Sequence, residues 1–487
     1  MSELIGTINA IAWGPLMLLL LLGTGIYLTF GLGFLTLRRL PTGFAMLLRG
    51  RRGTGSGDIS TPKPPFSALM TSLSATIGTG NIAGVATALA LGGPGALFWM
   101  WITALFGMAT KYAEAVCAVH FREQDSEGNF SGGPMYYIRN GLKKHWHFLA
   151  FAFAIFGSLA GFGIANTVQS NSISQVLKDG FGVAPLLTGV VLMVLVGAVV
   201  LGGIRRISTV ASYLVPLMAG SYLLMGLIVI ATHIGEVPAA VNIIVSSAFT
   251  GSAAMGGFAG ATIRFGVARG IFSNEAGLGS APIAHAAAQT KEPVEQGLIA
   301  MLGTFIDTIV ICTMTALVIL TVRGDFVHEG QAVLHAWQSD RVGFEMTSGA
   351  FAAAFPAMLG SIPIGTLVAS IVLILFVFTT LLTWSYYGER AITFIYDRVS
   401  KSATRANEKK LHVAWRILWC VVIFIGAAQP SELVWRLGDI SNATMLLPNI
   451  LALALLSGVV FKLSRGEKEA GPTHEADAPP AEVEAEV

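Results

Sequence analysis

The decisive stretch of this 487-residue chain runs from Phe66 to Gly107 and reads FSALMTSLSATIGTGNIAGVATALALGGPGALFWMWITALFG. It begins as an apolar helix, is interrupted by small and polar residues that include Gly78 and Gly80, and then resumes. Each such glycine costs a helix about 1 kcal/mol relative to alanine, and in a bilayer the freed backbone groups find no water. Such a break is tolerated where the backbone lines a cavity. The alternative is a glycine-rich contact between two helices.

The composition indicates the class of protein. Hydrophobic residues make up 54% of the chain and charged residues only 12%, against about 25% charged in a typical soluble domain. The chain therefore reads as a polytopic membrane protein with about eleven spans. Its first apolar run, from about Ile11 to Leu37, is too long for a signal peptide and predicts a true span.

The sequence shows no pattern typical of a disulfide, a metal site or a catalytic cluster. The three cysteines fall inside apolar runs, zinc-type spacings are absent, and the histidines are scattered. We therefore expect no cofactor, no nucleic-acid partner and no enzymatic activity. The partners we expect are a lipid bilayer, a small molecule and a coupling ion, with the chain working as a monomer.

The spans divide into an ordered series of segments. We expect an extra span and a basic cytoplasmic linker over 1–64, five core spans over 65–233, five more over 234–464 with an outer lid at 323–359, and a disordered cytoplasmic tail over 465–487. A short surface helix is expected near 237–256. One set of alternate loops carries most of the Lys and Arg, and the other holds only Lys178, Arg323, Arg341 and Arg436. The positive-inside rule then places the N-terminus outside and the C-terminus in the cytoplasm of the cell (inner) membrane.

A second interruption falls at the corresponding place in the second half. The expected span 258–288 is broken at Phe272–Ser280, which reads FSNEAGLGS. Counted from residue 65, the two interrupted spans are the first and sixth core spans (core 1 and core 6), and they enter the membrane from opposite sides. Paired interruptions in inverted halves indicate the binding site of a secondary transporter.

Three motifs carry a resemblance to a known family. The sequences GGPGALFWMWITALFG at 92–107, GTGNIAGV at 78–85 and RGIFSNEAGLGS at 269–280 resemble the sodium:alanine symporter family, and the likeness spans about 10–462. The resemblance implies an all-α, five-plus-five inverted-repeat fold of the leucine-transporter type with one extra N-terminal span. It also implies sodium-driven uptake of small neutral amino acids, alanine and glycine above all.

The two breaks suggest how an amino acid zwitterion is held. The half-helix that starts near Gly80 offers free N–H groups to the carboxylate, and carbonyls of the second break accept from the ammonium. Asn81 and Asn274 either coordinate a second ion or cap the broken ends. Gln169 either donates to the carboxylate or bonds between helices, and Asn166 shares its helix face. The substrate-site candidates are Thr79, Gly80, Asn81, Gln169, Phe272, Ser273, Asn274, Gly277 and Trp384.

Sodium as the coupling ion needs several oxygen ligands. Carbonyls of Ser74 and Ile77 in core 1 are candidates, together with hydroxyls of core 8, the helix that completes a sodium site in the implied fold. Thr380 with Thr379 is the preferred pair and Thr383 the reserve. The competing interpretation is that each hydroxyl bonds its own helix backbone four residues earlier.

Charged residues inside the spans are candidates for function. Lys111 and Glu114 stand three apart and are expected to pair. Asp307 lies near the ion path or pairs with Arg264 or Arg269. Glu275 is expected to bond backbone amides of the second break. A proton-coupled symporter of the same fold, with Asp307 or Glu275 as the titrating group, is the alternative to sodium coupling.

Overall fold

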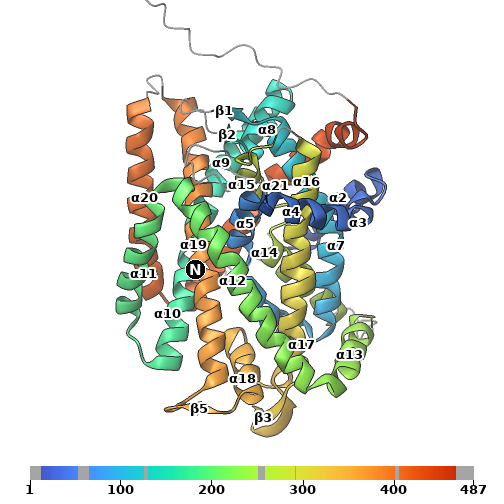
Figure 1. The fold of residues 1–487 in the computed structure, drawn as a ribbon, viewed down its shortest axis with the longest axis vertical. Coiled ribbons are helices and arrows are strands. Elements are labelled where there is room, and N and C mark those ends of the chain that lie inside the picture. The colour runs from blue at the N-terminus through green and yellow to red at the C-terminus, as the bar shows by residue number, and fades with distance from the viewer. Residues whose placement is uncertain are drawn as a thin grey trace, which may run out of the picture.

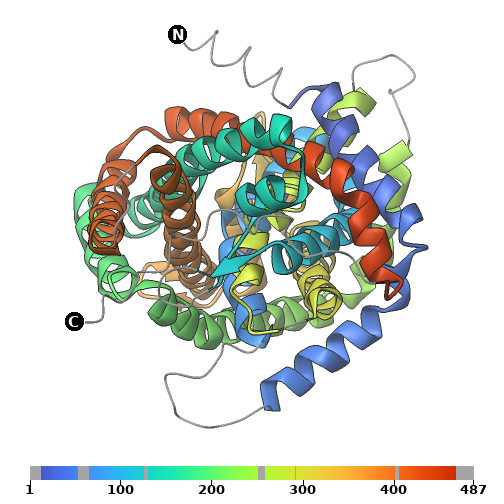
Figure 2. The same cartoon turned by 90° about the horizontal axis from the view of Figure 1, so that it is seen from above.

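The computed structural model describes residues 13–52, 65–124, 130–249, 258–290, 292–400 and 405–467. These residues form an upright bundle of helices with short hairpins at its ends (Figure 1). Viewed from above, the bundle is oval, and α4 lies along its edge (Figure 2). The tail beyond residue 467 and the linker 53–64, for which we predicted disorder and a basic character, lie outside the described residues.

The first part of the bundle contains the extra N-terminal segment and the first five core spans. Its helices are α2 Pro15–Gly31, α3 Leu35–Arg38, α4 Leu40–Arg52, α5 Pro65–Thr76, η1 Gly80–Gly84, α6 Val85–Gly92, α7 Gly95–His120, α8 Pro134–Gly141, η2 Lys144–Trp146, α9 His147–Ala160, η3 Gly161–Thr167, α10 Val168–Phe181, α11 Pro185–Val200 and α12 Gly203–Thr232. A short antiparallel hairpin joins β1 Glu123–Gln124 to β2 Phe130–Ser131.

The second part repeats the pattern with a longer insertion. Its helices are η4 Ile234–Glu236, α13 Val237–Phe249, α14 Phe258–Asn274, α15 Ala281–Ala286, α16 Pro293–Thr304, η6 Phe305–Cys312, α17 Thr313–Thr321, η7 Ala336–Gln338, α18 Phe344–Ala354, α19 Ile364–Val399, α20 Arg405–Ala428 and α21 Ser431–Ser464. Two hairpins pair β3 Arg323–His328 with β4 Gln331–His335 and β5 Met358–Leu359 with β6 Ile362–Pro363.

The predicted spans coincide with helices. Among the described residues, seven helices are individually long and apolar enough to cross a membrane, or eight if the bent pair of α5 and α6 is one span. Three shorter apolar helices are Pro15–Gly31, Pro185–Val200 and Ile234–Phe249. This helical membrane architecture confirms the predicted class of fold.

The break in core 1 is a true bend. The Pro65–Thr76 helix and the Gly80–Gly92 helix meet at 55°. A Cβ placed on Gly78 would lie 2.8 Å from the Thr380 hydroxyl oxygen, and one on Gly80 would lie 3.0 Å from the Ser273 Cα. The two glycines are therefore required because other helices approach the break closely.

The break in core 6 uses left-handed backbone. After α14 ends at Asn274, Glu275, Gly277 and Gly279 have φ angles of +56°, +89° and +81°. The two glycines adopt such angles at little cost, and the helix resumes as α15. The second break is therefore a sharp reversal of backbone conformation, whereas the first is a bend.

Among the described residues, three helices carry π-helical turns, which sequence periodicity did not predict. They are η1 in core 1, η3 in core 3 and η6 in core 7. Each contains a buried polar residue: Asn81, Asn166 and Asp307, respectively. π-Helical turns occur frequently at functional sites.

Two boundaries differ from the predictions. We predicted a basic linker after the first span, yet α4 is a helix whose Leu47 is buried and whose Phe44 ring lies 5.8 Å from Phe305. The apolar face of α4, which the adjoining arginines obscured, packs on α16. The apolar stretch of core 8, the span that carries Thr380, ends near residue 387, but its helix α19 continues to Val399.

The expected outer lid, 323–359, also has more structure than predicted. Its hydrophilic part forms the β3–β4 hairpin, whose turn places Glu329 and Gly330 at φ +49° and +80°. The apolar part of the lid contains the helix α18, Phe344–Ala354.

Candidate substrate and ion site

The two breaks face each other at the centre of the bundle and enclose a small cavity. Its volume is about 20 Å³, and a water needs about 10–15 Å³. The lining comes from both breaks and from α10, α19, α21 and η3, and comprises Ala75, Thr76, Gly78, Thr79, Gly80, Ile164, Ala165, Gln169, Phe272, Glu275, Leu278, Thr380, Trp384 and Asn442. Five of the predicted substrate-site residues therefore line one cavity: Thr79, Gly80, Gln169, Phe272 and Trp384.

One wall of this region gathers oxygen atoms from α5 and α19. The Thr380 Oγ1 lies 3.2 Å from the carbonyl oxygen of Ala75 and 3.4 Å from that of Ile77. The Ser74 hydroxyl is hydrogen-bonded to the Thr383 hydroxyl. Oxygen atoms without a fixed positive partner are ligands suited to a hard cation.

The predicted sodium ligands do not all lie at this wall. Thr379 Oγ1 lies 3.5 Å from Met218 Sδ and 2.9 Å from the Phe376 carbonyl oxygen, so it faces α12. Successive residues point in different directions on a helix of 3.6 residues per turn. The structure therefore places Thr380 and Thr383 against α5, and Thr379 away from it. The Thr380 hydroxyl also donates to the carbonyl oxygen of Phe376, four residues earlier on the same helix. The hydrogen bond of our alternative interpretation is therefore present as well.

A second polar cluster lies behind the breaks, and we call it the Asp307 cluster. Asn81 Nδ2 donates to Asp307 Oδ1 at 2.6 Å and to Ser273 Oγ at 3.0 Å. Asp307 Oδ2 accepts from Ser273 at 2.7 Å and from Thr308 at 2.8 Å. Asn274 Nδ2 completes the cluster by donating to Thr308 Oγ1 at 3.1 Å. All five side chains are fully buried.

The Asp307 carboxylate is surrounded by neutral donors. Within the described part of the chain it forms no ion pair with Arg264 or Arg269, because Arg269 lies 3.6 Å from Asp439 instead. Of the two alternatives for Asp307, the arginine partner is therefore wrong, and a place near the ion path stays a prediction. Asn81 Oδ1 also accepts from the Gly78 amide at 2.9 Å, so Asn81 both caps the break and bonds the carboxylate.

Gln169 contacts the first break directly. Its Nε2 donates to Thr79 Oγ1 at 3.1 Å, and its Oε1 lies 3.5 Å from the Thr79 amide nitrogen. Asn166 donates instead to the Trp419 carbonyl at 2.9 Å on α20. The two side chains therefore contact different elements, contrary to the shared face we predicted, because η3 changes the helical register before Gln169.

Trp384 and Glu275 form another wall of the cavity. Trp384 Nε1 donates to Glu275 Oε1 at 3.0 Å, and the Ser280 hydroxyl donates to Glu275 Oε2 at 2.5 Å. Glu275 therefore bonds side chains, contrary to our prediction that it bonds amides of the break. Trp384 is buried and forms part of the cavity wall, as predicted for a substrate-site residue.

Glu114 performs the role predicted for Glu275. Its Oε1 accepts from the Gly279 amide at 3.0 Å and from Asn449 Nδ2 at 2.7 Å, and Asn449 also donates to the Gly277 carbonyl at 2.8 Å. Gly277 thus faces α21 and lies outside the cavity lining. The predicted pair of Glu114 with Lys111 is absent among the described ion pairs, and the buried Lys111 Nζ has no hydrogen-bond partner there.

Several of these residues could not be found from sequence. Every residue has a backbone carbonyl group, so the residue type of Ala75 does not indicate that its carbonyl contacts Thr380. Asn449 and Asn442 lie in an apolar span with no motif around them. The presence of two polar side chains inside this apolar span was the one feature of the sequence that could have indicated them.

Phe272 closes the cavity toward the lid. Its ring centroid lies 5.8 Å from that of Trp435. Beyond Trp435 is a wider cavity of about 760 Å³ between α10, α18, α19 and α21. One pair of aromatic rings therefore separates the small central cavity from a large vestibule.

A helical membrane bundle with two broken helices facing each other across a small polar cavity is a secondary transporter. The chain belongs to the sodium:alanine symporter family, whose family model matches residues 1–474.

Known proteins support this placement. A sodium/alanine symporter, AgcS, of Methanococcus maripaludis is 47% identical over 470 residues, covering 96% of this chain and 97% of that protein. A probable sodium/glutamine symporter, GlnT, of Bacillus subtilis is 39% identical and covers 95% of this chain and 89% of its own.

The crystal structure of MhsT in complex with L-phenylalanine superposes with a TM-score of 0.58 at 12% identity, covering 83% of this chain and 92% of that one. This similarity concerns the fold alone. It confirms the predicted inverted-repeat architecture of the leucine-transporter type.

Proposed function

We propose that this protein is a sodium-coupled symporter that carries small neutral amino acids, alanine and glycine above all, into the cell by alternating access. The observation that carries the proposal is the set of oxygen atoms around Thr380, which joins the first break to α19. Membership of a family named for sodium and alanine supports it.

The groups that line the cavity match the two charges of a small zwitterion, and the cavity of about 20 Å³ must widen to admit one. The amide end of the half-helix at Gly80 and the Gln169 amide offer donors to a carboxylate, and the Glu275 carboxylate lies on the lining to accept from an ammonium. Trp384 and Phe272 limit the space for a side chain. These walls favour a methyl group or a hydrogen over a longer side chain.

Two places accommodate sodium in this proposal. The first lies between Ala75, Ile77 and Thr380, with Ser74 and Thr383 beside it. The second is the Asp307 cluster, whose carboxylate is surrounded by amides and hydroxyls. Binding of sodium at the first place stabilises the bend between α5 and α6, and differential affinity for one conformation drives the transport cycle.

Alternating access would occur by rocking of α5–α7 and α14–α17 against the other helices. The Phe272–Trp435 pair separates the cavity from the vestibule, and the 323–359 segment acts as outer lid. The N-terminus lies outside the cell (inner) membrane, the C-terminus lies in the cytoplasm, and the chain works as a monomer.

The alternative is proton coupling on the same fold, for which the buried Asp307 carboxylate is the specific observation. The test is uptake of labelled alanine and glycine into proteoliposomes under an imposed sodium gradient and, separately, an imposed proton gradient. Accumulation with sodium alone is the expected result. Accumulation with protons alone would move the coupling site to Asp307, and no accumulation of either amino acid would contradict the substrate.

A further inference from the structure

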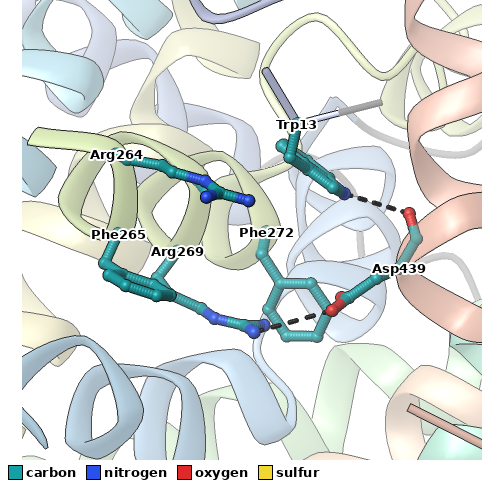
Figure 3. A pocket seen from close by; sticks show the side chains of 7 residues that line it. Trp13, Arg264, Phe265, Arg269, Phe272 and Asp439 are labelled. Carbon is teal, nitrogen blue, oxygen red and sulfur yellow. Dashed lines mark hydrogen bonds and ion pairs between the residues drawn. The ribbon is translucent and has the colours of Figure 1, made fainter. Parts of the chain in front are cut away.

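A second pocket lies beside the central cavity, between the N-terminal segment, α14 and α21 (Figure 3). Its volume is about 60 Å³. It is lined by Trp13, Arg264, Phe265, Ala268, Arg269, Phe272 and Asp439. Trp13, from the segment that precedes the ten-helix core, thus meets residues of the second repeat.

The pocket has an excess of positive charge. The Arg269 Nη2 lies 3.6 Å from Asp439 Oδ2, which is longer than a hydrogen bond, and the buried Arg269 Nε has no hydrogen-bond partner among the described residues. Arg264 forms no ion pair with a residue that the structure describes, and its guanidinium carbon lies 6.0 Å from the Phe265 ring centroid. Two guanidinium groups reach into the pocket, as Figure 3 shows, beside one carboxylate.

The rest of the pocket is a rigid aromatic frame. Trp13 Nε1 donates to the Asp439 carbonyl oxygen at 3.1 Å, which fixes the indole over the pocket. The Arg269 guanidinium lies 5.4 Å from the Phe272 ring centroid and 5.9 Å from that of Trp435. A guanidinium presents planar paired donors that match a carboxylate, whereas the aromatic walls exclude a large polar side chain.

Phe272 connects this pocket to the central cavity, because its side chain lines both. The Phe272 side chain therefore borders both the outer pocket and the central cavity. Rotation of that ring, which is also part of the barrier formed with Trp435, would join the two spaces.

We propose that this pocket is an outer binding site for a small amino acid, which places its carboxylate between Arg264 and Arg269 and its ammonium at Asp439 before it passes Phe272. The proposal rests on the proposed function, because the ligand is the transported molecule. Occupation of the site supplies a negative charge that no described residue gives to Arg264, and Asp439 then contacts both the ligand and Arg269.

The test counts bound molecules on the purified full-length protein. Equilibrium binding of labelled alanine at saturating sodium should give two sites for each wild-type chain and one for Arg264→Gln. In proteoliposomes Arg264→Gln should raise the KM for alanine about tenfold, because a charged hydrogen bond is lost, with little change in kcat. Arg264→Lys keeps the charge without the planar donors and should fall between the two.

Lys178→Gln is the matched control, since it removes one exposed positive charge from the C-terminal end of α10 without touching the pocket. One bound alanine in both wild type and Arg264→Gln, with unchanged KM, would overturn the outer site and leave sodium-coupled transport intact. Absence of both binding and uptake in the wild type would instead overturn the proposed function.

Small anions share this chemistry, so competition completes the test. Acetate should displace the second alanine at constant ionic strength, because it offers the same carboxylate. Displacement by chloride with no effect of acetate would assign the pocket to a halide and would overturn the amino-acid site.

Discussion

The hydroxyl of Thr380 lies between α19 and the last carbonyl groups of α5. Thr380→Ala removes one oxygen from this group and should raise the sodium concentration for half-maximal uptake about tenfold, which corresponds to about 1.4 kcal/mol. Thr380→Ser should retain most of the affinity. The measurement is alanine uptake against sodium concentration.

A substitution at Thr379 tests whether sodium is bound by Thr380 alone or by both threonines. Thr379 faces Met218 on α12, so Thr379→Ala should leave the sodium dependence close to that of the wild type. A shift as large as that of Thr380→Ala would show that the ion site involves both residues and that the geometric assignment is wrong.

Gly78 is a second residue whose surroundings give a sharp expectation. Gly78→Ala would place a Cβ 2.8 Å from the Thr380 hydroxyl oxygen, so the break and α19 must separate. Sodium-dependent uptake should fall at least tenfold while the protein still folds and purifies. Gly220→Ala, with no atom within 4 Å of the new Cβ, is the control, and equal activity of the two variants would contradict the close approach.

At the scale of elements, Glu114 ties the second break to α7 and α21. Glu114→Gln can keep both bonds at Oε1, but it places the two donors of an amide nitrogen where Oε2 has no described partner and removes the negative charge near the buried Lys111, at a cost of about 1–3 kcal/mol. We expect a lower midpoint of thermal unfolding in detergent and slower transport. Glu295→Gln, in the first turn of α16, should leave the midpoint unchanged.

The β3–β4 hairpin supports a prediction about pH. The Glu329 amide and the His328 ring bond the Asp340 carboxylate at 3.0 and 2.7 Å, and these bonds lower the pKa of Asp340, the amide contributing most. A depressed pKa means that the bonds stabilise the hairpin above the ordinary pKa of an aspartate and are lost as the pH falls below it. Hydrogen exchange at the Glu329 amide, corrected for intrinsic rate, should therefore accelerate in acid, and Asp340→Asn should abolish that dependence.

The positions of the broken helices could be predicted from the sequence, whereas the directions of individual side chains could not. Apolar length and the glycine pairs predicted both broken helices, and residue type predicted that Thr380, Gln169 and Trp384 would contact the breaks. The direction of each side chain was harder to predict. Thr379 and Thr380 are chemically equal in sequence and differ by one step around a helix, and the register of Asn166 depends on η3. Which acidic residue would bond the second break, Glu114 or Glu275, depended on packing between distant segments.

For the whole molecule, the Phe272–Trp435 pair is the barrier between the central cavity and the vestibule. In a background that lacks Cys117, Cys312 and Cys420, a cysteine introduced by Asn442→Cys reports on access to the cavity, because Asn442 lines it. Adding Trp435→Ala should speed labelling of this cysteine by a membrane-impermeant thiol reagent from the lid side.

Sodium and alanine together should slow that labelling in the protein that retains Trp435, because they favour the closed cavity. Trp337→Ala, on η7 beside the lid hairpin, serves as the control for loss of a tryptophan at this end of the bundle. Equal labelling rates with and without Trp435 would mean that another element closes the cavity.

The π-helical turns have a consequence for how such a chain tolerates change. A π turn differs from an α-helical turn by one additional residue, so removal of one codon within 305–312 would restore a continuous α-helix through this span. Because the π turn accommodates the additional residue, the helical segments on both sides of the deletion would keep their packing, and the residues inside the turn, Asp307 among them, would change direction by up to about 100°. The span would still cross the bilayer, yet Asp307 and Thr315 could no longer both face Asn81, to which each is now bonded. A single-codon deletion could thus separate membrane assembly, which needs only apolar length, from the alignment that the polar centre requires.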